Sequence, residues 1–317
     1  MNGRPSDGPS FELRHLRYFV AVAEERNFGR AAERLGIAQP GLSQQIASLE
    51  ALVGTRLLDR SRRLFGLTLP GHTFLAEARK TLAQADAAFV AVQRAARGET
   101  GRVSIGYVAS AAYSGVLTEV ISGFRAAFAE VELVLIEMEM LRQLDRIAEG
   151  MLDFGFIRPP APASALRGLE AMTMQSEPLV ALLPAGHRLA AEREVALREL
   201  AAEVFIVPNQ TADVGFHRQT ALACKAAGVD PVIEPTGRDF MTIASMVTVG
   251  LGVALVPASM ECMQLPGIVY RPLASPVTRS EISAVFRRNE AAPAANAFIT
   301  HCRGEVRRRA IALGNLE

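Results

Sequence analysis

Residues 27–49 constrain the fold of this chain more than any other segment, because their apolar positions predict two short helices joined by a tight turn. Asn27 is suited to cap the first helix, and Gly36 supplies the turn, since glycine adopts a positive φ without steric cost. The inward face of the first helix comprises Ala31, Ala32 and Leu35. The inward face of the second helix comprises Leu42, Ile46 and Leu49.

The outward face of the second predicted helix is polar but carries no charge. It comprises Gln39, Pro40, Gly41, Ser43, Gln44, Gln45 and Ser48. Pro40 is expected as the first helical residue, where its missing N–H is not needed. Amides offer a donor and an acceptor together, and hydroxyls do so on a shorter arm, which suits base edges and phosphates of DNA. The alternative is a plain helical bundle with a solvated polar face.

The residues on either side of this pair of helices extend the same pattern. Before it, a further helix is predicted with an apolar face formed by Leu16, Phe19, Val20 and Ala23. After it, two short extended runs flank an arginine-rich turn; they contain Leu57 with Leu58, and Leu67 with Thr68 and Leu69. The turn itself carries Arg60, Arg62 and Arg63. Such a wing places arginines against phosphates or a narrow minor groove.

A long helix is predicted from about residue 71 to residue 97, ending at Gly98. Its apolar residues alternate at steps of three and four and form a heptad seam: Leu75, Ala78, Leu82, Ala85, Phe89, Val92 and Ala96. The rest of its surface is polar, which favours a dimerising helix over one packed on its own domain. A dimer matters physically, because two half-sites multiply the discrimination that one helix achieves on DNA.

From residue 101 onward, strands alternate with helices. Strands are predicted near 103–108, 131–138, 151–157, 178–184, 203–208, 253–257 and 281–287. Helices are predicted near 116–128, 141–149, 216–227 and 241–249, with a last one running to about 313. The strands are short continuous apolar runs, typical of a parallel sheet covered on both faces. The region is long for one such unit, so two small α/β subdomains are expected, with chain crossovers near 158–169 and 270–275.

The N-terminal part of the chain resembles the DNA-binding domain of LysR-type transcriptional regulators. The likeness rests on LRHLRYFVAVAEERNFGRAAERLGIAQPGLSQQIASLEALVGTRLLDRS, followed by LTLPGHTFL. It is greatest for the branch that controls the breakdown of aromatic compounds, such as the benzoate, muconate and chlorocatechol regulators. The resemblance implies these DNA-binding residues: Arg30, Ala31, Gln39, Pro40, Gly41, Ser43, Gln44, Arg62 and Arg63. The chain departs from the branch at Gly41, where a second proline is usual, and at Gln44, where an arginine is usual.

The C-terminal part is similar to the effector-binding domain of the same regulators, on the runs EGMLDFGFIR, PLVALLPAGHRLA and VGLGVALVPAS. The implied fold class is α/β overall. It has an N-terminal all-α winged helix-turn-helix domain (12–70), a dimerising linker helix (71–98) and a C-terminal two-lobed α/β domain of periplasmic-binding-protein-like shape (101–317). Lobe 1 is expected at about 101–169 and 275–317, and lobe 2 at about 170–274.

The resemblance also implies an effector site in the cleft between the lobes, formed by Ser110, Met140, Arg158, Asn209 and Phe216. The Ser110 hydroxyl and neighbouring N–H groups are suited to a carboxylate, although a simple helix cap is the alternative. Arg158 pairs either with an acidic ligand or in an ordinary hinge salt bridge. Met140 stands where the branch commonly has a threonine, which argues against simple muconate recognition. The expected effector is an aromatic or carboxylate metabolite.

Composition bounds the remaining possibilities. Three scattered cysteines and five histidines show no metal-ligand spacing, so neither a metal nor another cofactor is expected. No apolar run reaches the roughly 18 residues that cross a membrane, and the chain is expected in the cytoplasm. The resemblance implies that the partners are promoter DNA, a small-molecule effector, further copies of the chain in a dimer or tetramer, and RNA polymerase, with action as an activator. The alternative is a solute-binding protein or an enzyme built on the α/β part.

Overall fold

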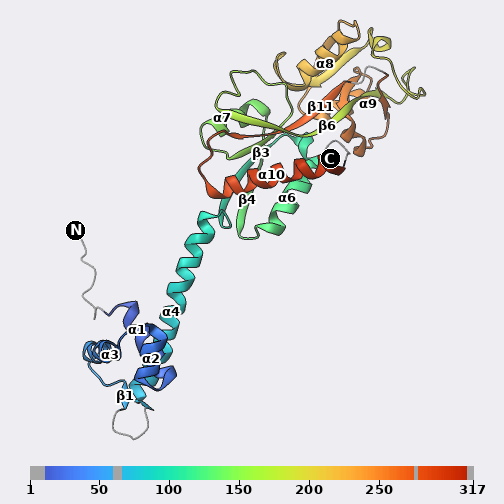
Figure 1. Cartoon of the computed structure of the whole chain (residues 1–317). Helices are drawn as coiled ribbons and strands as arrows, with labels where there is room; N and C mark the ends of the chain where they lie inside the picture. Colours follow the sequence, from blue (N-terminus) through green and yellow to red (C-terminus); the bar gives the residue numbers. More distant parts are fainter. Residues whose placement is uncertain (1–10, 60–65, 275–277, 313–317) are drawn as a thin grey trace, which may run out of the picture. The chain divides into compact units, whose positions relative to one another are not determined.

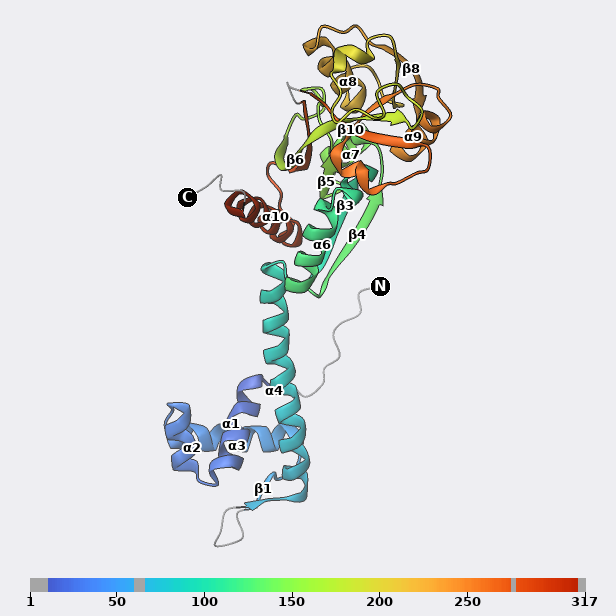
Figure 2. The ribbon, with the colours of Figure 1, turned by 90° about the vertical axis from the view of Figure 1, so that its right-hand side faces the viewer.

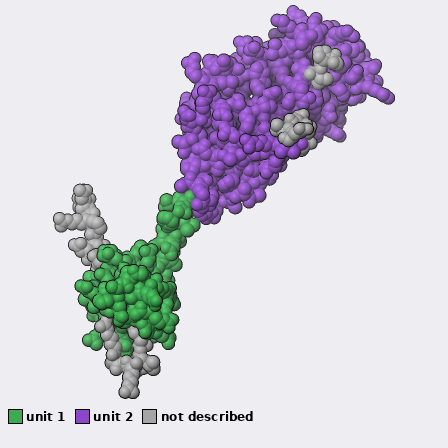
Figure 3. All heavy atoms as spheres, viewed as in Figure 1, with its two compact units in different colours: residues 1–93 green, residues 94–317 purple. Residues whose placement is uncertain are grey.

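A computed structural model of the chain describes residues 11–59, 66–274 and 278–312 (Figure 1). The chain divides into two compact units, residues 1–93 and residues 94–317 (Figure 3). Each unit has an apolar core of its own. Within the described residues, none of the helices is long and apolar enough to cross a membrane.

Three short helices begin the first unit: α1 (Leu13–Glu25), α2 (Phe28–Leu35) and α3 (Gln39–Val53). Phe19, Leu42 and Ile46 are fully buried at the centre of their shared core. The predicted apolar faces are confirmed with two changes: on α1, Val22 is buried and Val20 only partly so, and on α2, Leu35 is partly buried. The helical step of about 100° per residue carries Val20 to the edge of the face that Val22 completes.

The turns between these helices follow the local sequence. The Asn27 side chain accepts a hydrogen bond from the Arg30 N–H at 3.0 Å, which confirms it as the cap of α2. Gly36 ends α2 with φ of 67°, in the left-handed region where glycine is favoured. Pro40 is the second residue of α3 rather than the first, because Ala38 is the cap. Its missing N–H still costs nothing, since first-turn N–H groups have no partner within a helix.

A small antiparallel pair of strands follows α3, as the wing requires. β1 (Leu58–Asp59) pairs with β2 (Gly66–Leu67). The predicted second run is shorter than expected, because Leu69 already belongs to the next helix. Residues 60–65 lie outside the described residues, so the structure does not place Arg60, Arg62 or Arg63.

The predicted long helix is confirmed as α4 (Leu69–Ala96), which begins two residues earlier than expected. Gly71 in its first turn packs directly on the backbone of Leu57. Further along, apolar side chains of α4 face solvent: Phe89, Val90 and Val92 are more than half exposed. Phe89 and Val92 belong to the heptad seam, so part of the seam has no covering partner among the described residues.

The first lobe of the second unit is a five-stranded sheet with helices on both faces. Its strands are β3 (Gly101–Tyr107), β4 (Val131–Glu137), β5 (Phe154–Ile157), the first part of β6 (Leu169–Pro184) and β11 (Arg279–Arg287), in the order β6-β11-β5-β3-β4. α6 (Val116–Ala127) and α10 (Pro293–Ala312) lie on one face, and α7 (Met140–Ala148) lies on the other (Figure 1 and Figure 2).

The second lobe is built around the other part of β6. There β10 (Ile268–Pro272) and β9 (Ala254–Pro257) pair with it on opposite sides. A separate parallel pair, β7 (Val204–Pro208) and β8 (Val232–Gly237), lies with α8 (Gly215–Ala226) and α9 (Phe240–Thr248) in the same core. Two short elements also bear on the site: α5 (Ala109–Tyr113) and the 3-10 helix η2 (Ala258–Cys262).

Two predictions about this unit were wrong. The sheet is mixed rather than parallel, because β11 runs antiparallel to both β5 and β6. The chain passes from the first lobe to the second inside β6, at Pro178 and Leu179, and not between residues 158 and 169. The first part of β6 was missed because its residues alternate between buried and exposed, and it lacks a continuous apolar run.

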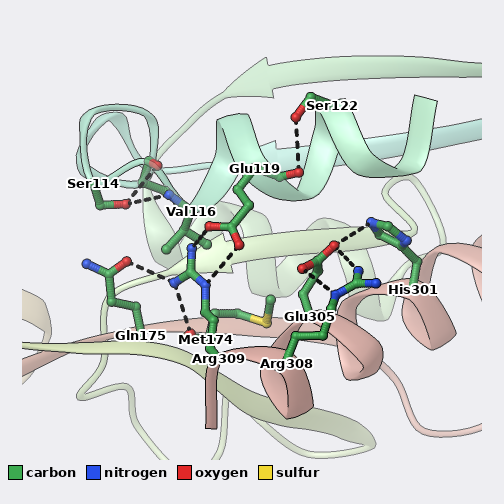
Figure 4. A network of polar contacts seen from close by, with 11 residues as sticks. Ser114, Val116, Glu119, Ser122, Met174, Gln175, His301, Glu305, Arg308 and Arg309 are labelled. Carbon is green, nitrogen blue, oxygen red and sulfur yellow. Dashed lines mark hydrogen bonds and ion pairs between the residues drawn. The ribbon is translucent and has the colours of Figure 1, made fainter. Parts of the chain in front are cut away.

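A polar network ties α10 to the rest of the first lobe (Figure 4). Arg309 pairs with Glu119 of α6 and donates to the Gln175 side-chain oxygen at 3.1 Å. One turn earlier on α10, Glu305 accepts from Arg308 and lies 3.4 Å from the His301 ring nitrogen. The Arg309 contacts join the C-terminal helix to α6 and β6, whereas the Glu305 contacts lie within α10 itself.

The close packing of Gly71 on Leu57 can be tested by substitution. We expect Gly71→Ala to lower the free energy of unfolding by about 1–3 kcal/mol, because an added Cβ would overlap the Leu57 carbonyl group. Gly41→Ala is the matched control in α3, where a Cβ meets no atom within 4 Å and should be neutral or stabilise by about 0.5–1 kcal/mol. Calorimetry on the full chain measures both, and equal effects would contradict the close approach.

Candidate functional site

The outward face of α3 keeps the uncharged polar surface predicted from the sequence. Gln39, Pro40, Gly41 and Gln44 are exposed, and Ser43 is half-buried. At the start of α3, the cap residue Ala38 has no side-chain acceptor, so within the described part of the chain the N–H groups of Gln39 and Gly41 remain for phosphates. This face therefore presents amides, a hydroxyl and backbone donors together.

Arg30 and Ala31 of α2 were both predicted to contact DNA, and they differ in how exposed their side chains are. Arg30 is exposed, and its guanidinium lies 3.1 Å from the Glu25 carboxylate. Ala31, in contrast, is fully buried in the core of the first unit, so its side chain packs there and does not face a ligand. Helix α2 uses that position to approach α1 and α3 closely, so a DNA contact at Ala31 stays a prediction that involves its backbone alone.

His15 of α1 orients Gln45 of α3, which the sequence analysis placed on the polar face without a specific role. The Glu12 N–H donates to His15 Nδ1 at 2.9 Å, so a neutral ring carries its proton on Nε2. That nitrogen lies 2.9 Å from Gln45 Oε1 and donates to it. The Gln45 amide is thereby fixed by its oxygen, which leaves its NH₂ group as the available donor.

The second unit contains a pocket of about 570 Å³ between its two lobes. Four of the five predicted effector residues line it: Ser110, Met140, Arg158 and Phe216. Asn209 does not, since it is exposed on the surface beside the strand end. Its neighbour Gln210 lines the pocket instead and accepts a hydrogen bond from the Phe216 N–H at 3.0 Å. A one-residue difference of this kind depends on how the chain turns after β7.

Arg158 lies at the floor of this pocket and is 4% exposed. It donates from Nε to Ser110 Oγ at 2.8 Å and from Nη1 to Ser280 Oγ at 3.0 Å. Its Nη2 meets the Glu177 carboxylate at 2.6 Å, and Glu177 is also buried. The salt-bridge alternative is thus the arrangement observed. Burial lowers the pKa of Arg158, and the Glu177 charge opposes that shift.

Glu177 links the two lobes through the same carboxylate. It belongs to the first-lobe part of β6, and it accepts hydrogen bonds from the Ser259 N–H at 2.7 Å and the Ser259 hydroxyl at 3.1 Å. Ser259 is in η2 of the second lobe. Because a buried charge needs its partners, the network fixes how η2 sits on the first lobe.

Ser110 is oriented by Arg158 rather than by a helix end. It is the second residue of α5, whose cap is Val108, so the alternative of a simple helix cap does not hold. Its oxygen accepts from Arg158 Nε, and its own proton is then free to be donated. Ser110 therefore offers a hydrogen-bond donor to an acceptor in the pocket.

Helix starts and apolar side chains complete the pocket wall. Met140 begins α7, Phe216 lies in the first turn of α8 and Phe240 begins α9. The partial positive charge of helix N-termini favours anionic groups. The rings of Phe216 and Phe240 pack edge to face with centroids 4.7 Å apart, and the Arg158 guanidinium lies 5.8 Å from the Phe216 ring centre.

The buried pair of Arg158 and Glu177 predicts that two glutamate substitutions will differ in their effect on stability. We expect Glu177→Gln to destabilise the second unit by about 3–5 kcal/mol, because Arg158 is left buried without an opposing charge. The control Glu281→Gln changes an exposed side chain of β11 that bonds Thr173, and should alter stability by less than about 0.5 kcal/mol. Denaturant unfolding of the full chain decides this, and two equally small effects would contradict the assignment.

Both parts of the chain match protein-family models. Residues 13–72 match "Bacterial regulatory helix-turn-helix protein, lysR family", and residues 96–307 match "LysR substrate binding domain". The chain belongs to the LysR family. It is therefore a DNA-binding transcriptional regulator with an effector-binding domain, and the enzyme alternative is set aside.

Curated LysR relatives match over nearly their whole length. The chain is 39% identical over 293 residues to the uncharacterized HTH-type transcriptional regulator YnfL of Escherichia coli, covering 92% of this chain and 98% of that protein. It is 37% identical to BudR of Raoultella terrigena, over 91% and 99% of the two chains. BenM of Acinetobacter baylyi matches at 33%. These relatives therefore confirm the LysR family. They do not confirm the aromatic-compound branch that was predicted from the sequence.

Solved LysR structures share the fold. The crystal structure of CbnR, a LysR family transcriptional regulator, matches with a TM-score of 0.78 and 29% identity, over 92% of this chain and all of that one. Full-length CbnR in complex with its target DNA matches with a TM-score of 0.75. These likenesses confirm the predicted α/β chain with an N-terminal helix-turn-helix domain and a C-terminal substrate-binding domain.

Proposed function

We propose that this regulator contacts base edges with the uncharged face of α3 and contacts phosphates with the arginines of the wing, in response to a small-molecule effector in the interlobe pocket. The observation that carries the proposal is the exposed set of amide, hydroxyl and backbone donors at the start of α3. Base-edge contacts discriminate between sequences, whereas phosphate contacts position the protein on any duplex.

The identity of the residues on α3 sets the expected base preference. Gln39 and Gln44 are bidentate amides, suited to adenine, and they stand beside Gly41, which adds no side chain. Arg30 contributes a cation next to this face, while Arg62 and Arg63 are assigned to phosphates by resemblance alone. Gln45, held through its oxygen by His15, contributes a donor only.

Two substitutions separate the two kinds of contact. We expect Gln39→Ala to lose discrimination between operator variants by about 1–3 kcal/mol per affected base pair, with little change in the salt dependence. Arg63→Ala should weaken binding to all sequences alike and flatten the salt dependence by about one unit of slope. Gel-shift titrations of the full chain at several salt concentrations measure both. Identical behaviour of the two variants would refute the division.

We infer that two chains pair through α4 and that dimers assemble further into a tetramer. Support comes from the seam itself: Phe89 and Val92 are 67% and 69% exposed on a helix that repeats apolar residues at heptad spacing. Large apolar side chains on a long helix lose solvent contact when a second such helix packs against them. A tetramer presents four DNA-binding units, whose spacing then governs DNA bending and the access of RNA polymerase.

The seam is tested by placing one charge on or beside it. We expect Val92→Asp to convert dimers into monomers at micromolar concentration, because a carboxylate at a buried seam position is desolvated without a partner. Gln93→Asp puts the same charge on the adjacent polar position and should leave the oligomeric state unchanged. Light scattering after size exclusion reports the mass, and a dimeric Val92→Asp protein would exclude this interface.

For the effector, we propose a small organic molecule with a carboxylate and an apolar body. The hydroxyl donor of Ser110 and the helix starts at Met140 and Phe216 support the carboxylate. The apolar side chains of Met140 and Phe216, both 2% exposed, support the apolar body. Effector binding between the lobes changes their closure only if the ligand contacts both, and contacts on each side of the pocket meet that condition.

A further inference from the structure

The interlobe pocket is lined by more charged side chains than the binding of a single carboxylate requires. Besides Arg158, whose charge Glu177 opposes, five charged side chains line it: Glu137, Glu139, Arg142, Arg238 and Asp239. Among the residues that the structure describes, none of the five takes part in an ion pair. With Arg158 neutralised by Glu177, the three carboxylates of the wall outnumber its two guanidinium groups, so the wall is slightly acidic on balance.

Asp239 is the best placed of these carboxylates. It caps α9 of the second lobe, with Oδ1 accepting from the Thr242 N–H at 2.8 Å. Its other oxygen accepts no hydrogen bond from the described part of the chain. It is also less exposed than Glu137, Glu139, Arg142 and Arg238, so its charge is less screened.

Each lobe contributes both signs of charge to the pocket wall: Glu137, Glu139 and Arg142 come from the first lobe, and Arg238 and Asp239 come from the second. Ser110 and Arg158 belong to the first lobe and offer donors, while Asp239 belongs to the second lobe and offers an acceptor. Tyr113 also lines the pocket: burial raises the pKa of its phenol, Arg158 opposes that shift, and Asp239 reinforces it. The phenol therefore stays neutral, within electrostatic reach of both a cation and a carboxylate.

A ligand with a carboxylate alone meets repulsion at one end of such a pocket. Like charges repel each other, and more strongly where burial reduces the screening by water. We propose that the effector is a zwitterion of the α-amino acid class, with its carboxylate at Ser110 and its ammonium group at Asp239. The proposal rests on the proposed regulatory function and replaces a plain aromatic or aliphatic acid with an amphoteric one.

This placement also accounts for how a ligand would act on the lobes. The carboxylate bonds to the first lobe and the ammonium group to the second, so one molecule bridges the pocket. A ligand that bridges binds the closed form more tightly than the open form, and this difference in affinity is what shifts the equilibrium. A des-amino acid keeps the first contact, loses the second and shifts the lobes less.

The test compares ligands that differ only in the ammonium group. Titration calorimetry of the full chain would use L-leucine against 4-methylpentanoate, and L-phenylalanine against 3-phenylpropanoate. We expect at least one amino acid to bind, and to bind roughly tenfold or more tightly than its des-amino partner, since a charge-assisted hydrogen bond is worth about 1.5–3 kcal/mol.

Two variants locate the ammonium group. Asp239→Asn keeps the helix cap, because asparagine caps as well as aspartate, and should reduce amino acid affinity about tenfold while leaving the des-amino acid unaffected. Glu234→Gln removes an exposed carboxylate of β8 that does not line the pocket, and should change neither affinity.

Each outcome distinguishes the ligand class from the regulatory function. If a des-amino acid binds as tightly as its amino acid, the zwitterion is overturned while a carboxylate effector stands. If Asp239→Asn leaves amino acid affinity unchanged, the ammonium site is overturned. If no member of either pair binds at millimolar concentration, while the same protein still shifts its operator DNA, the ligand class is overturned and the DNA-binding function is untouched.

Discussion

The second unit depends on one buried ion pair, between Arg158 and Glu177. Both side chains are almost fully buried, so each charge needs the other together with the hydroxyl groups that complete its hydrogen bonds. This requirement orders what surrounds the pair. Ser110 turns its proton away from Arg158, and Ser259 of η2 is drawn onto β6. The pocket floor is therefore already neutralised before a ligand binds. The charged side chains on the pocket walls then determine which ligand charge is favoured.

The first unit was predictable from sequence because its determinants are local. A cap at Asn27, a turn at Gly36 and apolar steps of three and four specify α2 and α3 without reference to distant residues. Ala31 was assigned to DNA by resemblance although its own periodicity turned it inward, and its side chain is buried. The wing arginines stay predictions, since they lie outside the described residues.

The second unit was predictable only in part, because its determinants are distant in sequence. Helices and apolar strands were recognised, but β8, β10, α5 and the first part of β6 have no strong periodic signal. Strand order depends on β11, which returns from the far end of the chain to lie between β5 and β6. Likewise, Arg158 finds Glu177 only after β6 is in place, and only the turn after β7 decides between Asn209 and Gln210.

The passage of β6 through both lobes has a mechanical consequence. β6 is shared by both lobes, so a rotation of one lobe about the strand direction leaves this strand intact, whereas a separation along it would stretch the backbone. Pro178 stands where the strand changes its neighbours, and proline supplies no N–H to the ladder at that point. β6 thus provides an axis about which the two lobes can rotate. Its hydrogen-bond ladder lacks one N–H donor at Pro178, where the strand passes from one lobe to the other.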